Sequence, residues 1–265
     1  MKYLYETHLH TSQASACAIS PGRDYIAGYK TLGYTGIMVT DHFYNGNSCL
    51  DRNLSWKDWV NRFCRGYEDA REAGERQGIA VFFGWEETFD GDDYLVYGLD
   101  KEWLLRHPEA AAWSRREQYE TVRRYGGCVV QAHPFRQHHY IHTVHLYPDC
   151  VDAVEVANAG NHEQSYDALA MQYAQTQGLP ITAGTDIHAA QDLEEPQRIF
   201  GVYLDTELRS IQDYVEVIRA HTLREENLRM SPGRCVLHGN EQINLPVDGP
   251  ATYQACGDGR GLFSR

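Results

Sequence analysis

The chain has 265 residues, and its 37 acidic against 24 Lys and Arg side chains give a formal net charge of −13. This length suits one large α/β domain or two small ones, with enough chain to bury a sizeable core. Because nucleic acid and anionic membranes bind basic patches, we expect neither as a partner of so acidic a protein. A phosphorylated substrate would need a local source of positive charge, and bound divalent cations are the obvious one.

Short hydrophobic runs alternate along the chain with stretches of helical periodicity. The expected strands are Tyr3–Glu6, Gly36–Thr40, Ala80–Gly84, Tyr94–Tyr97, Cys128–Ala132, Ala153–Val156, Pro180–Ala183 and Ile199–Leu204. The expected helices are Gly22–Leu32, Trp56–Gln77, Arg115–Tyr125, Glu163–Gln177 and Leu208–Ala220. This alternation predicts a mostly parallel sheet covered by helices. Seven or eight such units in one chain favour a closed barrel, which we assign to residues 1–225, followed by an irregular tail or lid over residues 226–265.

Cysteine usage and the apolar segments predict the compartment. The seven cysteines form no CxxC pair and have no regular spacing, which argues against a disulfide framework. The first residues, MKYLYETHLH, lack the apolar stretch of a signal peptide, and no segment approaches the roughly 20 apolar residues of a membrane span. We therefore expect a cytoplasmic protein without a membrane anchor.

Clusters of ionisable residues follow the predicted strands directly, at the edge where barrel enzymes place their active sites. These clusters are His8 and His10, Asp41 and His42, Glu86, His133, and Asp186 and His188. An isolated HxH pair is more often two polar residues on a solvated edge, but five clusters at one edge favour a metal site. Alternate residues of a strand point to the same side, so both imidazoles of HxH can reach one ion. Imidazoles mixed with carboxylates suit Zn, Mn or Fe rather than Ca.

Two of these clusters pair an expected ligand with an acidic neighbour. Asp41 is either a helix N-cap or a carboxylate that supports His42 and carries protons, whereas His42 has no comparable structural role. Glu86 and Glu87 should face opposite sides of their strand. We expect Glu86 to point inward, because a carboxylate can bridge two ions. Glu87 could equally cap a neighbouring segment.

The segment after His133 offers further groups for substrate binding. Pro134 prevents a helix from starting there, which keeps His133 at the end of its strand. Arg136 has the planar set of donors that suits a phosphate, although a loop arginine is more often solvated or salt-bridged. Four histidines, His138, His139, His142 and His145, indicate a loop over the barrel mouth.

The ordered set HxH, Thr-Asp-His, Gly-x-Glu, His-Pro and Asp-x-His resembles the polymerase and histidinol phosphatase (PHP) superfamily over residues 3–205. The resemblance implies a distorted (β/α)7 barrel of the TIM-like type, up to three divalent ions and activity on phosphoesters. It also implies a ligand set. The first ion would bind His8, His10, Glu86 and Asp186, the second would share Glu86 and add His133, and the third would bind His42 and His188.

Three positions depart from the pattern of the PHP family. Glu6 stands where the family usually begins its first motif with Asp. Asp93 lies where many members have a histidine, and it would complete the second ion's ligands. Members also tend to place Asp or His several residues after HxH, and here Cys17 is the nearest ligand type, with Asp24 more remote.

The resemblance and the residues together predict hydrolysis of a small phosphorylated metabolite, either a phosphomonoester or a phosphodiester of nucleotide or sugar phosphate type. Arg136 would hold the phosphate, and Asp41 or a histidine of the 138–145 loop would protonate the leaving group. One alternative is a histidinol-phosphate phosphatase, although nothing in the sequence specifies an imidazole alcohol. Another is a non-catalytic, metal-binding regulatory protein. The acidic charge argues against a nuclease that acts on DNA.

Overall fold

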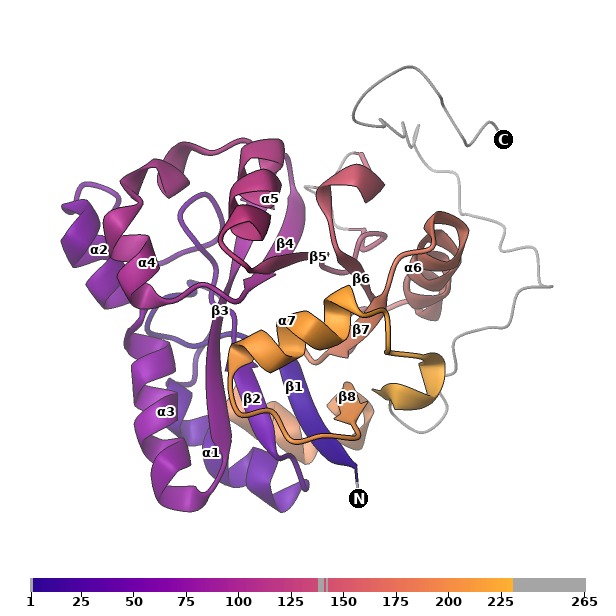
Figure 1. Cartoon of the computed structure of the whole chain (residues 1–265). Helices are drawn as coiled ribbons and strands as arrows, with labels where there is room; N and C mark the ends of the chain where they lie inside the picture. Colours follow the sequence, from indigo (N-terminus) through magenta and orange to yellow (C-terminus); the bar gives the residue numbers. More distant parts are fainter. Residues whose placement is uncertain (1, 138–140, 142, 231–265) are drawn as a thin grey trace.

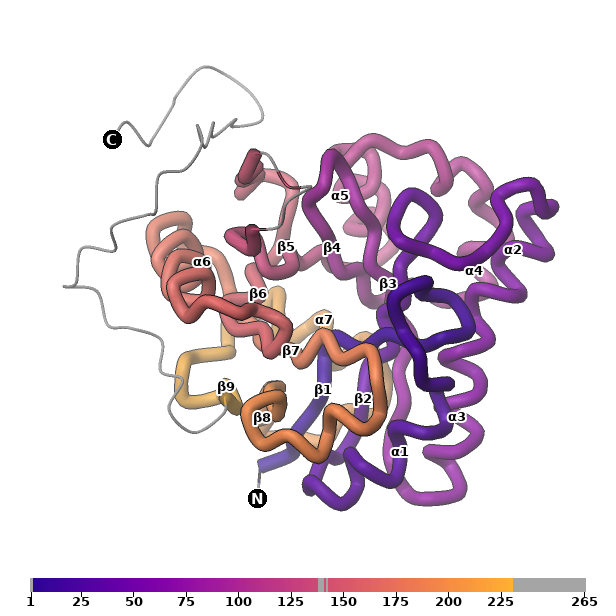
Figure 2. The backbone as a smooth tube through the Cα atoms, turned by 180° about the vertical axis from the view of Figure 1, so that it is seen from behind, coloured from indigo at the N-terminus to yellow at the C-terminus, as the bar shows by residue number. Residues whose placement is uncertain are grey.

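The computed structural model describes residues 2–137, 141 and 143–230. Its strands form one sheet in the order β7-β6-β5-β4-β3-β2-β1-β8-β9. The sheet curls until β7 returns to β1, where the main chain of Asp186 donates to His8 (2.8 Å) and that of His10 to Ile187 (3.2 Å). The result is a nearly closed barrel, seen from opposite sides in Figures 1 and 2. The predicted distorted TIM-like barrel is therefore confirmed.

All eight predicted strands are present. The strands are β1 (Tyr3–Leu9), β2 (Gly36–Val39), β3 (Ala80–Phe89), β4 (Asp92–Tyr97), β5 (Cys128–Gln131), β6 (Ala153–Asn158), β7 (Ile181–Gly184), β8 (Gly201–Leu204) and β9 (Leu228–Arg229). The sheet is less parallel than predicted, because β4 is antiparallel to both of its neighbours and β8 is antiparallel to β1. The β3–β4 hairpin turns at Asp90 and Gly91, which both have positive φ, and Asp-Gly is the dipeptide that favours such a turn.

Seven α-helices surround the described part of the sheet. They are α1 (Gly22–Thr31), α2 (Trp56–Phe63), α3 (Arg65–Gln77), α4 (Lys101–Arg106), α5 (Arg115–Arg124), α6 (Gln164–Gln177) and α7 (Ile211–Arg219). Short 3-10 helices cover Pro108–Ala112, Pro148–Cys150, Ala190–Glu194, Pro196–Arg198 and Glu225–Asn227. The single helix predicted over Trp56–Gln77 is in fact two helices that meet at Cys64, and α4 was not predicted. In Figure 1, α1 and α3 lie side by side at the lower left, next to β3, and α7 crosses in front of the strands.

An aromatic cluster fixes the loop that follows β2. Phe43 packs with ring centroids 5.2 Å from Trp59, 5.1 Å from Phe63 and 5.3 Å from Trp85, and all four side chains are buried. The Phe43 amide also donates to the carbonyl of Glu86 (2.7 Å). Aromatic packing therefore holds His42, the residue before Phe43, beside β3.

The start of the predicted tail belongs to the barrel, because β9 pairs with β8. Residues 231–265, which make up the rest of that predicted segment, lie outside the described residues. So do three of the four loop histidines, His138, His139 and His142. Among the described residues, no helix has the length and apolar character needed to cross a membrane.

Candidate metal centre

The strand ends bring eight predicted ligands together in four overlapping groups. Within each group, one ligand atom per residue lies within 4.8 Å of the others. The groups are His10, His42 and His188; His8, His133 and Asp186; His8, His10 and Glu86; and Glu86, Asp93 and His133. These side chains come from six of the barrel strands or the residues directly after them, from β1 to β5 and from β7. The clusters predicted from the sequence thus meet at one place.

Glu86 lies at the centre of these groups. Its Oε1 is 3.1 Å from Nε2 of His8 and 3.4 Å from Nε2 of His133. Its Oε2 is 2.7 Å from Nδ1 of His42 and 3.4 Å from Nε2 of His10. Both oxygens are buried, and within the described part of the chain neither has a partner in hydrogen-bond geometry. Four imidazoles that converge on a buried carboxylate in this way fit divalent ions bridged by Glu86.

Asp186 faces the same cluster from the end of β7. Its Oδ1 lies 3.1 Å from Nε2 of His10 and 3.4 Å from Nε2 of His8. Asp186 has a φ of 53° and His133 a φ of 28°, conformations that residues other than glycine rarely adopt. Backbone strain of this kind is concentrated at functional sites, so the two residues that carry it are good ligand candidates.

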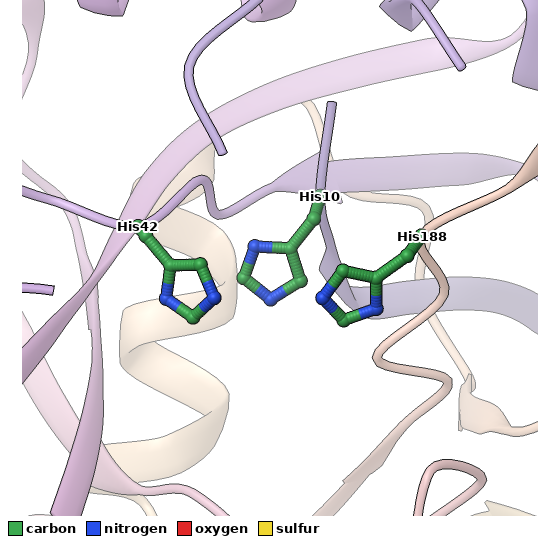
Figure 3. A group of neighbouring side chains, drawn as sticks. All are labelled: His10, His42 and His188. Atoms are coloured by element: carbon green, nitrogen blue, oxygen red, sulfur yellow. The ribbon is translucent and has the colours of Figure 1, made fainter. Parts of the chain in front are cut away.

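Three imidazoles form the outer side of the cluster. The ring of His10 lies between those of His42 and His188, as Figure 3 shows, with centroid distances of 4.3 Å and 4.5 Å. The His188 Nδ1 is 2.8 Å from the carbonyl oxygen of Asp186. A carbonyl only accepts, so this nitrogen carries the proton and Nε2 keeps its lone pair.

Buried groups behind the inner histidines fix their tautomers in the same way. The Nδ1 of His8 is 3.1 Å from Oε1 of Glu155, and the Nδ1 of His10 is 3.1 Å from Oγ of Ser15. Ser15 Oγ donates to Oδ1 of Asp41 (2.7 Å), so it accepts from His10. Each imidazole therefore turns its Nε2 toward the cluster, which is the usual arrangement behind a metal ligand.

Glu6 ties together the two strands that meet where the barrel closes. Its Oε1 accepts from the amides of His8 (2.7 Å) and Thr185 (2.9 Å), and its Oε2 accepts from the hydroxyl of Tyr29 (3.0 Å). Burial raises the pKa of Glu6 to about 7, although these hydrogen bonds oppose the rise. Glu6 thus holds the main chain beside two segments that carry candidate ligands.

The charges of the cluster shift the pKa values of its members strongly. Burial alone would raise the pKa of Glu86 and of Asp186, but nearby positive groups hold both well below the usual range. Burial together with the charges of His42 and His188 lowers the pKa of His10 well below its usual value. Burial would lower the pKa of His8 and of His42, but nearby carboxylates raise both well above the usual value. Divalent ions bind ionised carboxylates and neutral imidazoles, so the two carboxylates and His10 have the protonation states that suit metal binding.

The remaining predicted groups have definite partners. Asp93 Oδ1 accepts from Thr88 Oγ1 (2.6 Å), and its Oδ2 lies 3.9 Å from Nε2 of His133. Glu87 points away from the cluster and accepts from the Asn45 amide (3.0 Å), so it fastens a neighbouring segment. His145 lies 2.7 Å from Asp92.

Arg136 and Asp41, the two predicted catalytic residues, are both anchored. Arg136 donates to Asp186 (2.6 Å), Asn158 (2.6 Å) and Asn161 (3.0 Å). Asp41 is buried, and its oxygens accept from the amide and hydroxyl of Thr11 (2.6 Å each) and from the Ser15 hydroxyl. Through the Ser15 hydroxyl, Asp41 is therefore linked to Nδ1 of His10, the ring nitrogen that faces away from the cluster.

The two candidates for an additional outer ligand differ. The Cys17 side chain is exposed, and although partial burial would raise the pKa of its thiol, hydrogen bonds with His188 and His42 lower that pKa to about 6. Asp24 is exposed in the first turn of α1 and belongs to none of the candidate groups among the described residues. Cys17 likewise belongs to none of the candidate groups found in the described part of the chain.

Sequence reasoning missed the buried residues that support the candidate ligands. Glu155 and Ser15 contact His8 and His10, and neither follows a recognisable motif. A signal existed for Glu155, which is a lone acid inside the apolar run of β6. A charged side chain in a buried strand needs a partner, and that partner is His8.

Neither a protein-family model nor a curated protein sequence matches this chain. A solved structure from Bacteroides vulgatus, a two-domain protein with a predicted PHP-like metal-dependent phosphoesterase, is 16% identical with a TM-score of 0.56. The match covers 83% of this chain but only 64% of that protein, so this chain spans less than two thirds of its length.

Two other solved structures are similar over nearly their whole length. PsfC from Pseudomonas syringae is 17% identical with a TM-score of 0.52, and the match covers 83% of this chain and 95% of PsfC. An amidohydrolase from Chromobacterium violaceum is 14% identical with a TM-score of 0.50, and the match covers 81% and 96%. At sequence identities this low, the similarity shows a shared fold and no more. This chain shares the fold of these structures, and its own sheet forms the distorted barrel that its motifs implied.

Proposed function

We propose that the chain is a metal-dependent hydrolase that cleaves a phosphoester of a small metabolite. The observation that carries this proposal is the convergence of His8, His10, His42 and His133 on the two oxygens of Glu86. Two or three divalent ions such as Zn, Mn or Fe would suit this mixture of imidazoles and carboxylates. The metal-dependent phosphoesterase named for the Bacteroides vulgatus neighbour supports the same reaction class.

We assign the ligands as the resemblance implies. The first ion would bind His8, His10, Glu86 and Asp186. The second would bind Glu86, Asp93 and His133, and the third His42 and His188. The overlap of the candidate groups at Glu86 supports its role as the shared ligand.

The ions would supply positive charge for the phosphate oxygens, a water of lowered pKa and stabilisation of the leaving oxygen. The protein's own residues prepare the site for them. Glu155 and Ser15 hold the tautomers of His8 and His10, so their lone pairs already face inward. Arg136 is held by three side-chain acceptors, which use three of its five N–H groups. An anion at the cluster would meet a guanidinium that is already in position.

Asp41 is better suited to positioning than to proton transfer. Its oxygens are occupied by Thr11 and Ser15, and Ser15 links it to His10. We therefore propose that Asp41 orients His10 through Ser15, in place of the proton-donor role suggested by the sequence. His145 is paired with Asp92, so the geometry assigns no donor among the described loop residues.

The test is a hydrolysis screen of the purified protein, loaded with Mn, Zn or Fe, against nucleotides, sugar phosphates and histidinol phosphate. We expect release of phosphate, or cleavage of a diester, with His8→Ala and Asp186→Ala at least about 100-fold less active. The exposed His162→Ala serves as the control with unchanged activity. A selective reaction with histidinol phosphate would favour that alternative.

No hydrolysis with any of the three ions would contradict the proposal and favour a non-catalytic metal-binding protein. Full ion content and full activity in His8→Ala would contradict the ligand assignment. Salt-sensitive binding of DNA would overturn the expectation of a small-molecule substrate.

A further inference from the structure

We propose that Asn158, at the end of β6, is a positioning residue whose single carboxamide holds candidate ligands of both inner ions in place. The inference rests on the proposed metal centre and adds to it the residue that joins its supporting groups. The amide nitrogen of Asn158 is bound to Glu155, and its oxygen is bound to Arg136. Asn158 is fully buried and acts through these two side chains.

A bulge in β6 lets the side chains of Glu155 and Asn158 meet. Residues three apart in a regular strand face opposite sides of the sheet. The pairing of β6 with β7 changes register between Glu155 and Ala157, so β6 has one extra residue there. Bulges redirect side chains and are common beside active sites. Here the bulge allows Nδ2 of Asn158 to reach Oε2 of Glu155 at 2.8 Å.

The donor half of the amide supports two histidines. The oxygen of Glu155 that accepts from Asn158 also accepts from the main-chain amide of His133 (3.2 Å). The other oxygen of Glu155 lies 3.1 Å from Nδ1 of His8. The hydrogen bond from Asn158 therefore fixes the orientation of the carboxylate that sets the tautomer of His8.

The acceptor half of the amide supports Asp186. Oδ1 of Asn158 accepts from Nη2 of Arg136 (2.6 Å) and from the main-chain amide of Gly160 (2.7 Å). Nη1 of the same guanidinium donates to Oδ2 of Asp186 (2.6 Å). This contact leaves Oδ1 of Asp186 facing the cluster, where it lies 3.1 Å from Nε2 of His10.

The chemistry of the two partners requires an amide between them. The guanidinium of Arg136 only donates, and the ionised carboxylate of Glu155 only accepts. A side chain that joins them must accept at one atom and donate at the other, as a carboxamide does. The residues reached through the two halves are His8, His133 and Asp186, which form one of the four groups of candidate ligands. One amide thus supports a complete group.

Asn158→Asp tests the donor half, because it keeps an oxygen for Arg136 and places a second oxygen against Glu155. We expect zinc affinity, measured by competition with a chromophoric chelator, to fall about 10- to 100-fold. Asn53→Asp adds the same charge at an exposed position and should bind zinc as the wild type does. Unchanged affinity in Asn158→Asp would overturn the proposal.

The double variant Glu155→Gln/Asn158→Asp separates positioning from a general structural role. If Asn158 acts through Glu155, the double variant should bind zinc no more weakly than the weaker single variant, because no carboxylate remains at position 155 to be oriented. Two independent structural losses would multiply instead. Multiplied losses would contradict the role of Asn158.

Gly160→Ala tests the acceptor half while Asn158 stays in place. A Cβ at this position would lie 2.9 Å from Nη2 of Arg136 and 3.1 Å from Oδ2 of Asp186, so these groups must move. We expect zinc affinity to fall about tenfold. In spectra of protein labelled with ¹⁵N-histidine, the Nδ1 proton of His8 should shift in Asn158→Asp but not in Gly160→Ala. Identical spectra for wild type and Asn158→Asp, or wild-type affinity in Gly160→Ala, would refute the coupling.

Circular dichroism of each variant without metal checks that the fold is kept. If Asn158→Asp does not fold, Gly160→Ala still decides whether displacing the group bound to the amide oxygen weakens zinc binding. None of these measurements depends on hydrolysis. If the phosphoester screen fails while the variants lose zinc as expected, the positioning role stands and the reaction is wrong. If hydrolysis is found while Asn158→Asp binds zinc normally, the reaction stands and the role of Asn158 is wrong.

Discussion

The imidazole of His8 and the carboxylate of Glu155 form a fully buried pair. The Nδ1 of His8 lies 3.1 Å from Oε1 and 3.3 Å from Oε2 of Glu155, and both side chains are 0% exposed. Glu155 also accepts hydrogen bonds from the amide of His133 (3.2 Å) and from the side chain of Asn158 (2.8 Å). One carboxylate on β6 thus orients two of the proposed ligands from behind.

Removing the charge of Glu155 should weaken metal binding without removing a ligand. For Glu155→Gln we expect zinc affinity to fall about 10- to 100-fold, because the amide no longer stabilises the proton on Nδ1 of His8. Competition with a chromophoric chelator measures the change. Glu163→Gln, at an exposed acid just before α6, is the control. Unchanged affinity in Glu155→Gln would show that the pair only fills the core.

The chain from His10 through Ser15 to Asp41 should act in the same way. Ser15→Ala removes the hydroxyl that links the two side chains, and we expect zinc to bind about tenfold more weakly. Ser48→Ala, which removes a hydroxyl that donates to the carbonyl of Ala14, should leave binding unchanged. Isothermal titration of both variants distinguishes them. Equal zinc affinities of the two variants would show that Ser15 does not support the cluster.

Gly66 on α3 provides the space that Asp41 and Thr11 occupy. A Cβ at this position would overlap Oγ1 of Thr11 and lie 2.9 Å from Oδ2 of Asp41. Gly66→Ala should therefore lower the free energy of unfolding by about 1–3 kcal/mol, despite the better helix propensity of alanine. Urea unfolding measures the loss. Glu72→Ala, on the exposed face of α3, should change stability by less than about 1 kcal/mol.

Metal removal should destabilise the fold. The carboxylates of Glu86, Asp93 and Asp186 crowd one buried site, and ions that bind only the folded chain stabilise it by about 2.7 kcal/mol at 100 times the dissociation constant. We expect the melting temperature to fall when a chelator is added and to recover with Zn or Mn. Asp186→Ala should respond less to both additions. A wild-type melting temperature that does not change when the chelator is added would argue against bound ions.

The barrel and the convergence of the candidate ligands could be predicted because each depends on local patterns. Apolar runs that end in His8, His42 or Asp186 mark strands whose ends meet at one edge. The periodicity of Trp56–Gln77 also indicated helix, but it could not reveal the break at Cys64, where α2 ends and α3 begins.

The supporting residues could not be predicted because they depend on closure of the barrel. His8 and Glu155 are 147 positions apart, and only the curvature of the sheet brings them together. The anchoring of Arg136 by Asn158, Asn161 and Asp186 likewise joins segments with no pattern in common. The antiparallel β3–β4 hairpin could have been predicted from the sequence, since Asp90-Gly91 is a strong turn signal.

Elemental analysis of the purified protein, set beside that of Asp186→Ala, tests the proposed metal centre most directly. We predict two or three divalent ions per wild-type chain, from Zn, Mn and Fe, and at least one ion fewer in Asp186→Ala. Exposed His162→Ala should match the wild type. A wild-type chain that binds less than about one ion after incubation with each metal, or an Asp186→Ala chain with an unchanged ion count, would contradict the metal centre.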